Sequence, residues 1–223
     1  MPLPVRAICY YFSDPERNTQ WRDRDFTAYK LVKAVKGEAI NGYFQLKIDN
    51  QTHRFDNTNA GEAVALGAQA LAKRIADAVR EPMVLVPIPN SHVTATVADF
   101  RVLQFAQLVA RFLGGRAQVR TLLKWDRPMV QAHVGGERDP RVLLQRLVLA
   151  GQPDRLPHVL IDDVCTSGGH FIAAAAKLQS VGADVVLGAS FARTTDNQHD
   201  RMIGPIDFEL IHNLLGDDPF AFF

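Results

Sequence analysis

Two adjacent carboxylates stand directly before a turn of small residues in the stretch HVLIDDVCTSGGHF, residues 158–171. The apolar residues before the carboxylates predict a buried strand, and Thr166-Ser167-Gly168-Gly169 predicts a turn that opens a helix. Free backbone N–H groups at a helix N-terminus bind phosphate, and glycine lets the backbone approach it closely. Asp162 and Asp163 would repel that phosphate in direct contact, so they suit hydroxyl groups or a metal ion a few ångströms away. The pattern therefore fits a ribose 5-phosphate, with the phosphate in the turn and the hydroxyls on the carboxylates.

The turn differs from the common nucleotide-binding motifs. No Gly-Lys-Ser/Thr follows the glycines, which excludes a Walker A loop, and the sequence contains no G-x-G-x-x-G. The alternative is an ordinary strand-to-helix turn in which Asp, Thr and Ser cap the helix.

Strands and helices alternate around this unit. Continuous apolar runs predict buried strands at 83–89, 117–123, 158–164 and 184–192. Helices are predicted at 98–113 and from the turn to about residue 181, and a long loop at 124–140. This order predicts an α/β fold with a parallel sheet and right-handed crossovers, in which ligands bind at the carboxyl ends of the strands.

The first eighty residues have a different pattern. Aromatic and β-branched residues predict strands at 7–12 and 42–48, and helical spacing predicts helices at 26–35 and 59–79. We therefore predict a small αβ hood at 1–80, a core at 81–200 and a carboxyl-terminal extension at 201–223.

Charge and composition limit the class of protein. The net charge is +1, which argues against nucleic-acid binding driven by overall charge, although residues 101–146 hold nine basic residues against three acidic ones. Such a basic middle fits a compact anionic ligand at least as well as a polymer, and a solvated loop with scattered arginines is the alternative. No apolar run is long enough for a membrane helix, and the amino terminus lacks the layout of a signal peptide. Two cysteines make neither a disulfide framework nor a four-cysteine zinc site. A cytoplasmic location is therefore expected.

The stretch from Leu160 to His170 resembles the phosphoribosyl pyrophosphate (PRPP) signature of type I phosphoribosyltransferases. The resemblance extends toward the ComF-like branch through LVPIP at 85–89, the helix at 104–110, the stretch 131–141 and the strand at 182–194. It covers about residues 83–195 well and the first eighty only loosely. The four-cysteine zinc ribbon of many ComF-like proteins is absent from this sequence.

The resemblance implies a type I phosphoribosyltransferase-like parallel sheet flanked by helices, with the hood carrying the acceptor pocket. It implies Mg²⁺-dependent transfer of ribose 5-phosphate from PRPP to a nitrogen acceptor, a base or an amine, with release of pyrophosphate. Asp162 and Asp163 would hold the ribose hydroxyls, and Asp162 would also face Mg²⁺ through water or those hydroxyls. The other implied site residues are Thr166, Ser167, Gly168, Gly169 and His170 for the 5′-phosphate, Asn90, Ser91 and His92 in the pyrophosphate loop, and Arg138, which would close over pyrophosphate.

Three departures from the family pattern matter. His170 replaces a threonine and offers an imidazole that can carry a positive charge. Thr166 stands where purine-salvage members carry an aspartate facing the base, which argues against 6-oxopurine acceptors. Asn90-Ser91-His92 lacks the arginines usual after this strand. A second interpretation is therefore a non-catalytic module that senses PRPP or a nucleotide within a multi-protein complex.

Three further features carry expectations of their own. The aromatic segment 217–223 either docks on the protein's own surface or contacts a second copy or a protein partner. Trp125 is expected to pack or to anchor the neighbouring loop, with stacking on a base as the alternative. His133 and His158 have no partners at metal-ligand spacing and are expected at the surface or at a strand edge.

Overall fold

The computed structural model describes residues 2–12, 19–94, 99–130 and 137–211. Its helices and strands are, in chain order, β1 (Leu3–Phe12), α1 (Asp23–Val35), β2 (Phe44–Ile48), β3 (Gln51–Phe55), α2 (Ala60–Ala78), β4 (Met83–Pro87), α3 (Arg101–Leu113), η1 (Gly114–Arg116), β5 (Ala117–Val119), β6 (Leu123–Trp125), α4 (Pro140–Arg146), β7 (Leu147–Leu149), β8 (His158–Cys165), α5 (Gly169–Gln179), β9 (Val185–Thr195) and β10 (Ile203–Leu210). Within these ranges no helix is both long and apolar enough to cross a bilayer.

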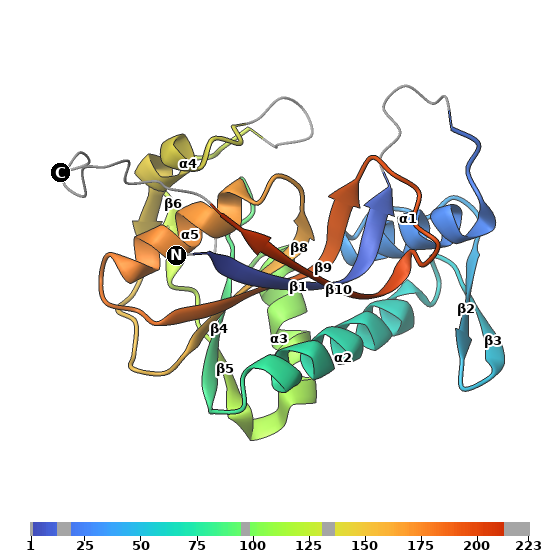
Figure 1. The fold of residues 1–223 in the computed structure, drawn as a ribbon, viewed down its shortest axis with the longest axis horizontal. Helices are drawn as coiled ribbons and strands as arrows, with labels where there is room; N and C mark the ends of the chain where they lie inside the picture. Colours follow the sequence, from blue (N-terminus) through green and yellow to red (C-terminus); the bar gives the residue numbers. More distant parts are fainter. Residues whose placement is uncertain (1, 13–18, 95–98, 131–136, 212–223) are drawn as a thin grey trace.

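A six-stranded sheet in the order β10-β1-β9-β8-β4-β5 forms the centre of the molecule (Figure 1). Every neighbouring pair is parallel except β1 and β10, which pair antiparallel at the edge. The predicted α/β fold with a mainly parallel sheet flanked by helices is confirmed. The carboxyl ends of β1, β4, β8 and β9 consequently point to the same side, where the loops that follow them meet.

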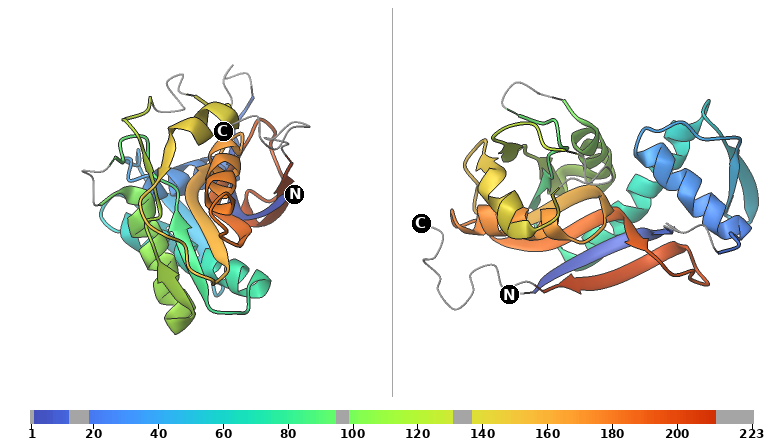
Figure 2. Two further views of the ribbon diagram at one scale, coloured as in Figure 1. Left: turned by 90° about the vertical axis from the view of Figure 1, so that its left-hand side faces the viewer. Right: turned by 90° about the horizontal axis from the view of Figure 1, so that it is seen from above.

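Helices cover both faces of this sheet. On one face, Leu71 of α2 and Val102 of α3 belong to one core cluster, together with residues of α1. On the other face, Leu143 of α4 and Phe171 of α5 belong to a second cluster. Figure 1 shows α2 and α3 on the opposite side of the sheet from α4 and α5, and the left view of Figure 2 shows the same layers end-on.

Strand β1 is part of the central sheet, although its residues were predicted to lie in a separate hood. Its side chains are apolar on both faces: Val5 belongs to the second cluster and Ile8 to the first. A strand that is apolar on both faces suits a sheet with helices on both sides. In agreement with this, β1 lies within the central sheet between β9 and β10, not in an outlying subdomain. From the same predicted segment, α1 and the β2–β3 hairpin lie together at one end (Figures 1 and 2).

Strand β10 comes from the predicted extension and pairs with β1 over Leu3–Ala7, with one further pair at Cys9. The central sheet therefore takes strands from all three segments into which the sequence was divided. Helix α2, also from the predicted hood, packs on the sheet at Gly67. A Cβ at that position would lie 2.2 Å from the Phe191 ring of β9, so only glycine permits this approach without a shift.

The long loop predicted at 124–140 is shorter in the structure. The strand expected at 117–123 divides into β5, at the edge of the main sheet, and β6, which pairs antiparallel with β7. Helix α4 begins at Pro140, whose fixed φ suits the first helical position, and the Asp139 side chain accepts a hydrogen bond from the backbone N–H of Arg141. This small β6–β7–α4 unit packs beside α5.

His158 is fully buried at the start of β8, and the expectation of a surface or strand-edge position was wrong for it. Its backbone pairs with both neighbouring strands, β4 and β9, which encloses the side chain. The ring Nε2 lies 3.8 Å from the Asp154 carboxylate. Burial nevertheless lowers the pKa of His158 below 6.5, with Asp154 opposing that effect. His133 lies outside the described residues.

This burial predicts a loss of stability in mild acid. Below about pH 6.5 the unfolded chain binds a proton at His158 before the folded chain does, so the free energy of unfolding falls as the pH drops toward the lowered pKa. When the pH falls from 7 to 5.5, we expect the free energy of unfolding of wild type to drop by about 1 kcal/mol more than that of His158→Phe. Urea unfolding of both proteins at each pH measures this difference. An equal loss in both proteins would contradict this assignment.

Candidate functional site

A cleft of about 260 Å³ lies at the carboxyl ends of the parallel strands. It is lined by the end of β1, the segment after α1, the loop after β4, the start of α3, and the end of β8 with the turn that follows. Most of the residues predicted for a site lie here, namely Asp162, Asp163, Thr166, His170 and the three loop residues 90–92. Segments far apart in the sequence thus meet in one place.

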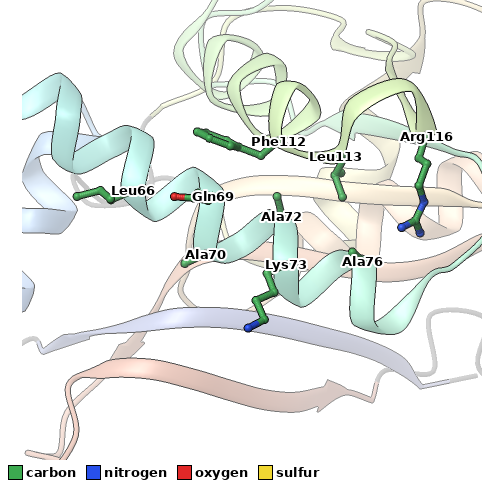
Figure 3. A pocket seen from close by; sticks show the side chains of 9 residues that line it. All are labelled: Leu66, Gln69, Ala70, Ala72, Lys73, Ala76, Phe112, Leu113 and Arg116. Atoms are coloured by element: carbon green, nitrogen blue, oxygen red, sulfur yellow. The ribbon is translucent and has the colours of Figure 1, made fainter. Parts of the chain in front are cut away.

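A second hollow, of about 430 Å³, lies between α2 and α3 (Figure 3). Its walls are Leu66, Phe112 and a row of alanines, and its charged lining residues are Lys73 and Arg116. None of its lining residues is a carboxylate. The cleft with the paired acids is therefore the candidate functional site.

The two aspartates in the cleft have different surroundings. Asp163 is 7% exposed, and its Oδ1 accepts a hydrogen bond of 2.8 Å from the N–H of Val164. Its Oδ2 accepts from Nε of Arg101 at 2.8 Å, and Nη2 of the same guanidinium lies 2.5 Å away. Asp162 accepts a hydrogen bond of 2.8 Å from the backbone N–H of Asp163. Asp163 thus has a dedicated cation, while Asp162 depends on a backbone N–H.

Burial raises the pKa of the Asp162 carboxyl well above its usual range, and the adjacent negative charge of Asp163 raises it further. A carboxylate in this position gains from any hydroxyl donor or cation that enters the cleft. Perturbed carboxylates in a cleft are typical of functional sites, and here the cause is identified.

The predicted phosphate turn opens α5 at the end of β8. Gly168, the residue before the helix, has φ +83°, a left-handed conformation that favours glycine. A Cβ on Gly168 would lie within 3 Å of the Leu210 side chain at the end of β10, and one on Gly169 would lie within 3 Å of the backbone carbonyl of Arg138. The turn is therefore held in shape by β10 on one side and by the chain before α4 on the other.

We expect Gly168→Ala to lower the free energy of unfolding by about 1–2 kcal/mol and to weaken ribose 5-phosphate binding at least tenfold. The added methyl is strained at positive φ and must displace Leu210, which shifts the N–H groups of the turn. Gly114→Ala is the matched control, because Gly114 has φ +63° with open space around it. Urea unfolding and calorimetric titration measure both effects. Unchanged binding by folded Gly168→Ala would contradict this role of the turn.

The loop after β4 is fixed by Trp125 of β6. The indole Nε1–H of this buried residue donates to the carbonyls of Pro89 and Asn90, both at 3.1 Å. The backbone N–H groups of Trp125 and Met129 add hydrogen bonds to the carbonyls of Val93 and Ser91. Trp125 is packed in the core, which is one of the two expectations for it, but the loop that it anchors is residues 88–93 and not the neighbouring loop after β6.

His170 lies in the first turn of α5, with its ring edge-on to Trp125 at 5.8 Å between centroids. Burial lowers the pKa of His170, and the charge of Asp163 only partly opposes this effect. Burial in this position therefore disfavours the charged imidazolium form of His170.

Arg138 lies outside the cleft. It lines a neighbouring hollow on the other side of the phosphate turn, together with Ser167 and Gly169, while Glu137 lines the cleft itself. The carboxylate of Glu137 accepts hydrogen bonds from the N–H groups of Arg138 and Asp139. The predicted role of Arg138 over pyrophosphate, and that of the stretch 131–136, which lies outside the described residues, stay predictions. The aromatic segment 217–223 lies outside them as well.

Sequence reasoning missed four polar residues of the cleft, beside several apolar ones. Tyr11, Lys36 and Glu38 line its hood end, where the Lys36 ammonium lies 2.5 Å from Glu38 and 5.7 Å from the centre of the Tyr11 ring. Burial raises the pKa of Tyr11 to about 12, so the phenol keeps its proton. These residues belong to no motif. The sequence analysis included Arg101 only as one of the basic residues of the segment 101–146. Its position near the start of a predicted helix was the one feature that could have indicated a place in the cleft.

Mg²⁺ fits the donor set of this cleft only together with a ligand. The described residues contain no group of three or more His, Cys, Asp or Glu side chains able to hold a metal ion. The Asp162–Asp163 pair offers two carboxylates, and Mg²⁺ is commonly held by one or two carboxylates plus the phosphates of a substrate. The pair therefore suits a metal that shares its ligands with a bound phosphate compound.

The chain matches no protein-family model and no curated protein. Among solved structures it is similar to a purine phosphoribosyltransferase from Pyrococcus horikoshii, at 12% identity over 60% of this chain and 83% of that chain, TM-score 0.39. It is also similar to an orotate phosphoribosyltransferase from Aeropyrum pernix, at 15% identity over 74% and 83% of the two chains, TM-score 0.39. It is similar as well to an adenine phosphoribosyltransferase from Saccharomyces cerevisiae, at 10% identity over 73% of this chain and 88% of that chain, with a TM-score of 0.39. At such low identities and TM-scores, only the residues of this chain can indicate its function.

Proposed function

We propose that this protein is a Mg²⁺-dependent phosphoribosyltransferase, which transfers ribose 5-phosphate from PRPP to a nitrogen acceptor and releases pyrophosphate. One observation carries the proposal. Asp162 and Asp163, the residues Thr166 and His170 on either side of the glycine turn, and the loop at 88–92 line a single cleft. These three parts suit the diol, the 5′-phosphate and the diphosphate of one molecule. Ser167 and Gly169 of the turn itself line the neighbouring hollow. The ComF-like resemblance of the sequence supports the same proposal.

In this proposal the turn 166–170 binds the 5′-phosphate through the free N–H groups at the start of α5. The carboxylates of Asp162 and Asp163 accept hydrogen bonds from the ribose hydroxyls. The N–H groups and side chains of Asn90, Ser91 and His92 hold the diphosphate, in a loop that Trp125 keeps ordered. The reacting carbon of the ribose then faces the hood end of the cleft.

The reaction forms a bond from the acceptor nitrogen to this carbon and breaks the bond from the carbon to the pyrophosphate oxygen, which leaves with the bonding electron pair. The proton that the acceptor nitrogen loses passes to solvent. Positive charge develops on the ribose as the leaving group departs, and the two carboxylates stabilise it through the hydroxyls. Mg²⁺, when bound by the aspartates and the substrate, supplies charge neutralisation on the diphosphate. Tyr11, Lys36 and Glu38 then form the wall against which the acceptor lies.

Isothermal titration with PRPP, with and without Mg²⁺, tests the proposal. We expect wild type to bind PRPP in a Mg²⁺-dependent manner, and the double variant Asp162→Asn/Asp163→Asn to lose this binding. Pyrophosphate release is then measured with a panel of bases and amines. Absence of PRPP binding by folded wild type would overturn the proposal.

A second function, a non-catalytic sensor of PRPP or a nucleotide, is favoured by one observation. The described cleft carries few cations for a diphosphate: Lys36 is paired with Glu38, and Arg101 with Asp163. Tight PRPP binding without pyrophosphate release for any acceptor in the panel would favour this function over the first.

A further inference from the structure

The loop assigned to the diphosphate contains no lysine or arginine. Asn90 and Ser91 are neutral, and His92 is the only ionisable residue of the three. A diphosphate is held in proteins by charge-assisted hydrogen bonds, above all from arginine, whose planar guanidinium binds two oxygens at once. The described residues that line the cleft include two permanent cations, Lys36 and Arg101.

Arg101 stands next to that loop although it lies eleven residues along the chain from Asn90. It is the first residue of α3, and the next residue, Val102, donates its backbone N–H to Oδ1 of Asn90 at 3.3 Å. This hydrogen bond joins the start of the helix to the loop. The Arg101 side chain consequently enters the cleft between the loop and the end of β8.

The guanidinium of Arg101 is held by two partners in the empty cleft. Nε and Nη2 contact the same oxygen of Asp163, at 2.8 and 2.5 Å, and Nη1 donates to the carbonyl of Lys36 at 3.0 Å. Its side chain is 38% exposed, whereas that of Asp163 is 10% exposed. Arg101 can therefore meet an entering anion while its carboxylate partner stays in place.

Lys36 is a weaker candidate for this role. Its ammonium lies 2.5 Å from Glu38 at the hood end, beside the Tyr11 ring. It belongs to the wall where the acceptor is proposed to lie. The His170 ring lies edge-on to the buried Trp125 at 5.8 Å between centroids and is not a guanidinium that could bind two oxygens at once.

We propose that Arg101 is the diphosphate-binding cation of this cleft, contributed by α3 in place of the arginines that the loop lacks, and that Asp163 holds it until the substrate enters. This inference rests on the proposed function. On binding, the guanidinium exchanges one carboxylate oxygen for the oxygens of the diphosphate. Asp163 is thereby released to the ribose hydroxyls, so one exchange prepares both halves of the site.

Calorimetric titrations of Arg101→Gln and Arg101→Lys with three ligands test the inference. The ligands are PRPP with Mg²⁺, inorganic pyrophosphate with Mg²⁺, and ribose 5-phosphate, which has no diphosphate. We expect Arg101→Gln to weaken PRPP and pyrophosphate binding by about 10- to 100-fold, and to bind ribose 5-phosphate no more weakly than wild type. Arg101→Lys keeps the charge but lacks the planar guanidinium. We expect its affinity for PRPP and pyrophosphate to lie between those of wild type and Arg101→Gln. Arg111→Gln, on the exposed side of the same helix, is the matched control.

Binding of Mn²⁺ alone provides a readout that does not depend on substrate. Removing Arg101 leaves two adjacent carboxylates without their cation, so Arg101→Gln is expected to bind Mn²⁺ at least tenfold more tightly than wild type, by electron paramagnetic resonance titration. A purely structural role for Arg101 predicts no such gain.

The outcomes separate this inference from the proposed function. If wild type binds PRPP and ribose 5-phosphate, and Arg101→Gln binds PRPP equally well, the inference is wrong and the proposed function stands. An equal loss of ribose 5-phosphate and PRPP binding also overturns it, because Arg101 then only keeps Asp163 in place. If wild type binds neither ligand, the proposed function fails. Should Arg101→Gln not fold, Arg101→Lys decides by the same comparison of pyrophosphate with ribose 5-phosphate.

Discussion

Asp162→Asn is expected to make the ligand-free protein more stable at pH 7, although it removes a residue of the proposed site. The raised pKa of Asp162 means that the folded state resists its ionisation more than the unfolded state does. The stability from this group is therefore present below its unfolded pKa of about 3.8, and is lost as the pH rises through the higher folded value. Asparagine has no charge to bury, and its amide oxygen can still accept the N–H of Asp163. We expect a gain of about 1–2 kcal/mol, or roughly 3–6 °C in Tm.

The same substitution at the next residue is expected to have the opposite sign. Asp163→Asn leaves the guanidinium of Arg101 without its charged partner and breaks the contacts at 2.8 and 2.5 Å. We expect a loss of about 1–3 kcal/mol. Asp77→Asn, an exposed carboxylate on α2, is the control for a change of net charge. Urea unfolding at pH 7 and at pH 4 measures all three, and the gain from Asp162→Asn is expected to shrink at pH 4.

Binding is expected to change in the opposite direction to stability for Asp162. A charge-assisted hydrogen bond to a ribose hydroxyl contributes about 1.5–3 kcal/mol, so Asp162→Asn should weaken PRPP binding roughly 10- to 150-fold. A variant that is both more stable and defective in binding identifies Asp162 as a residue kept for a ligand. Lower stability of Asp162→Asn at pH 7 would contradict the electrostatic account, and unchanged PRPP binding would contradict the site.

The part of the fold that the sequence predicts best is the part with continuous apolar strands. Strands β4, β8 and β9 are buried on both faces, and their sequences are apolar runs that admit few other structures. The glycine turn after β8 is also predictable, for a local reason of its own: its backbone conformation requires particular residue types. These elements alone bring Asp162, Asp163 and the turn to one edge of the sheet.

The remainder depends on contacts between distant segments. No local pattern shows that β1 enters the sheet between β9 and β10, because its aromatic residues are equally typical of a hairpin in a separate subdomain. The pairing of Arg101 with Asp163 joins positions 62 residues apart, and nothing in the sequence near either residue indicates it. The hood end of the cleft is unpredicted for the same reason, since Tyr11, Lys36 and Glu38 come together only through the packing of α1 on β1.

Replacement of Trp125 is expected to show that the loop of the proposed diphosphate site depends on the β6–β7 unit. Trp125 is 1% exposed, so Trp125→Ala should cost about 3–5 kcal/mol through the cavity that it leaves. Trp125→Phe keeps most of the packing and removes the N–H shared by the carbonyls of Pro89 and Asn90. We expect it to cost only about 1–2 kcal/mol in stability.

The larger effect of Trp125→Phe is expected on ligand binding, because two loop carbonyls lose their donor and the loop at 88–92 is no longer fixed. Pyrophosphate and PRPP should bind at least tenfold more weakly, while ribose 5-phosphate, which uses the turn after β8, should bind as to wild type. Leu71→Ala, in the core on α2, is the control: it is expected to cost about 2–5 kcal/mol without changing the affinity for any of the three ligands. Equal weakening of all three ligands by Trp125→Phe would show that the indole supports the cleft as a whole. Selective loss of the diphosphate ligands would instead connect one buried hydrogen bond in β6 to one end of the proposed substrate.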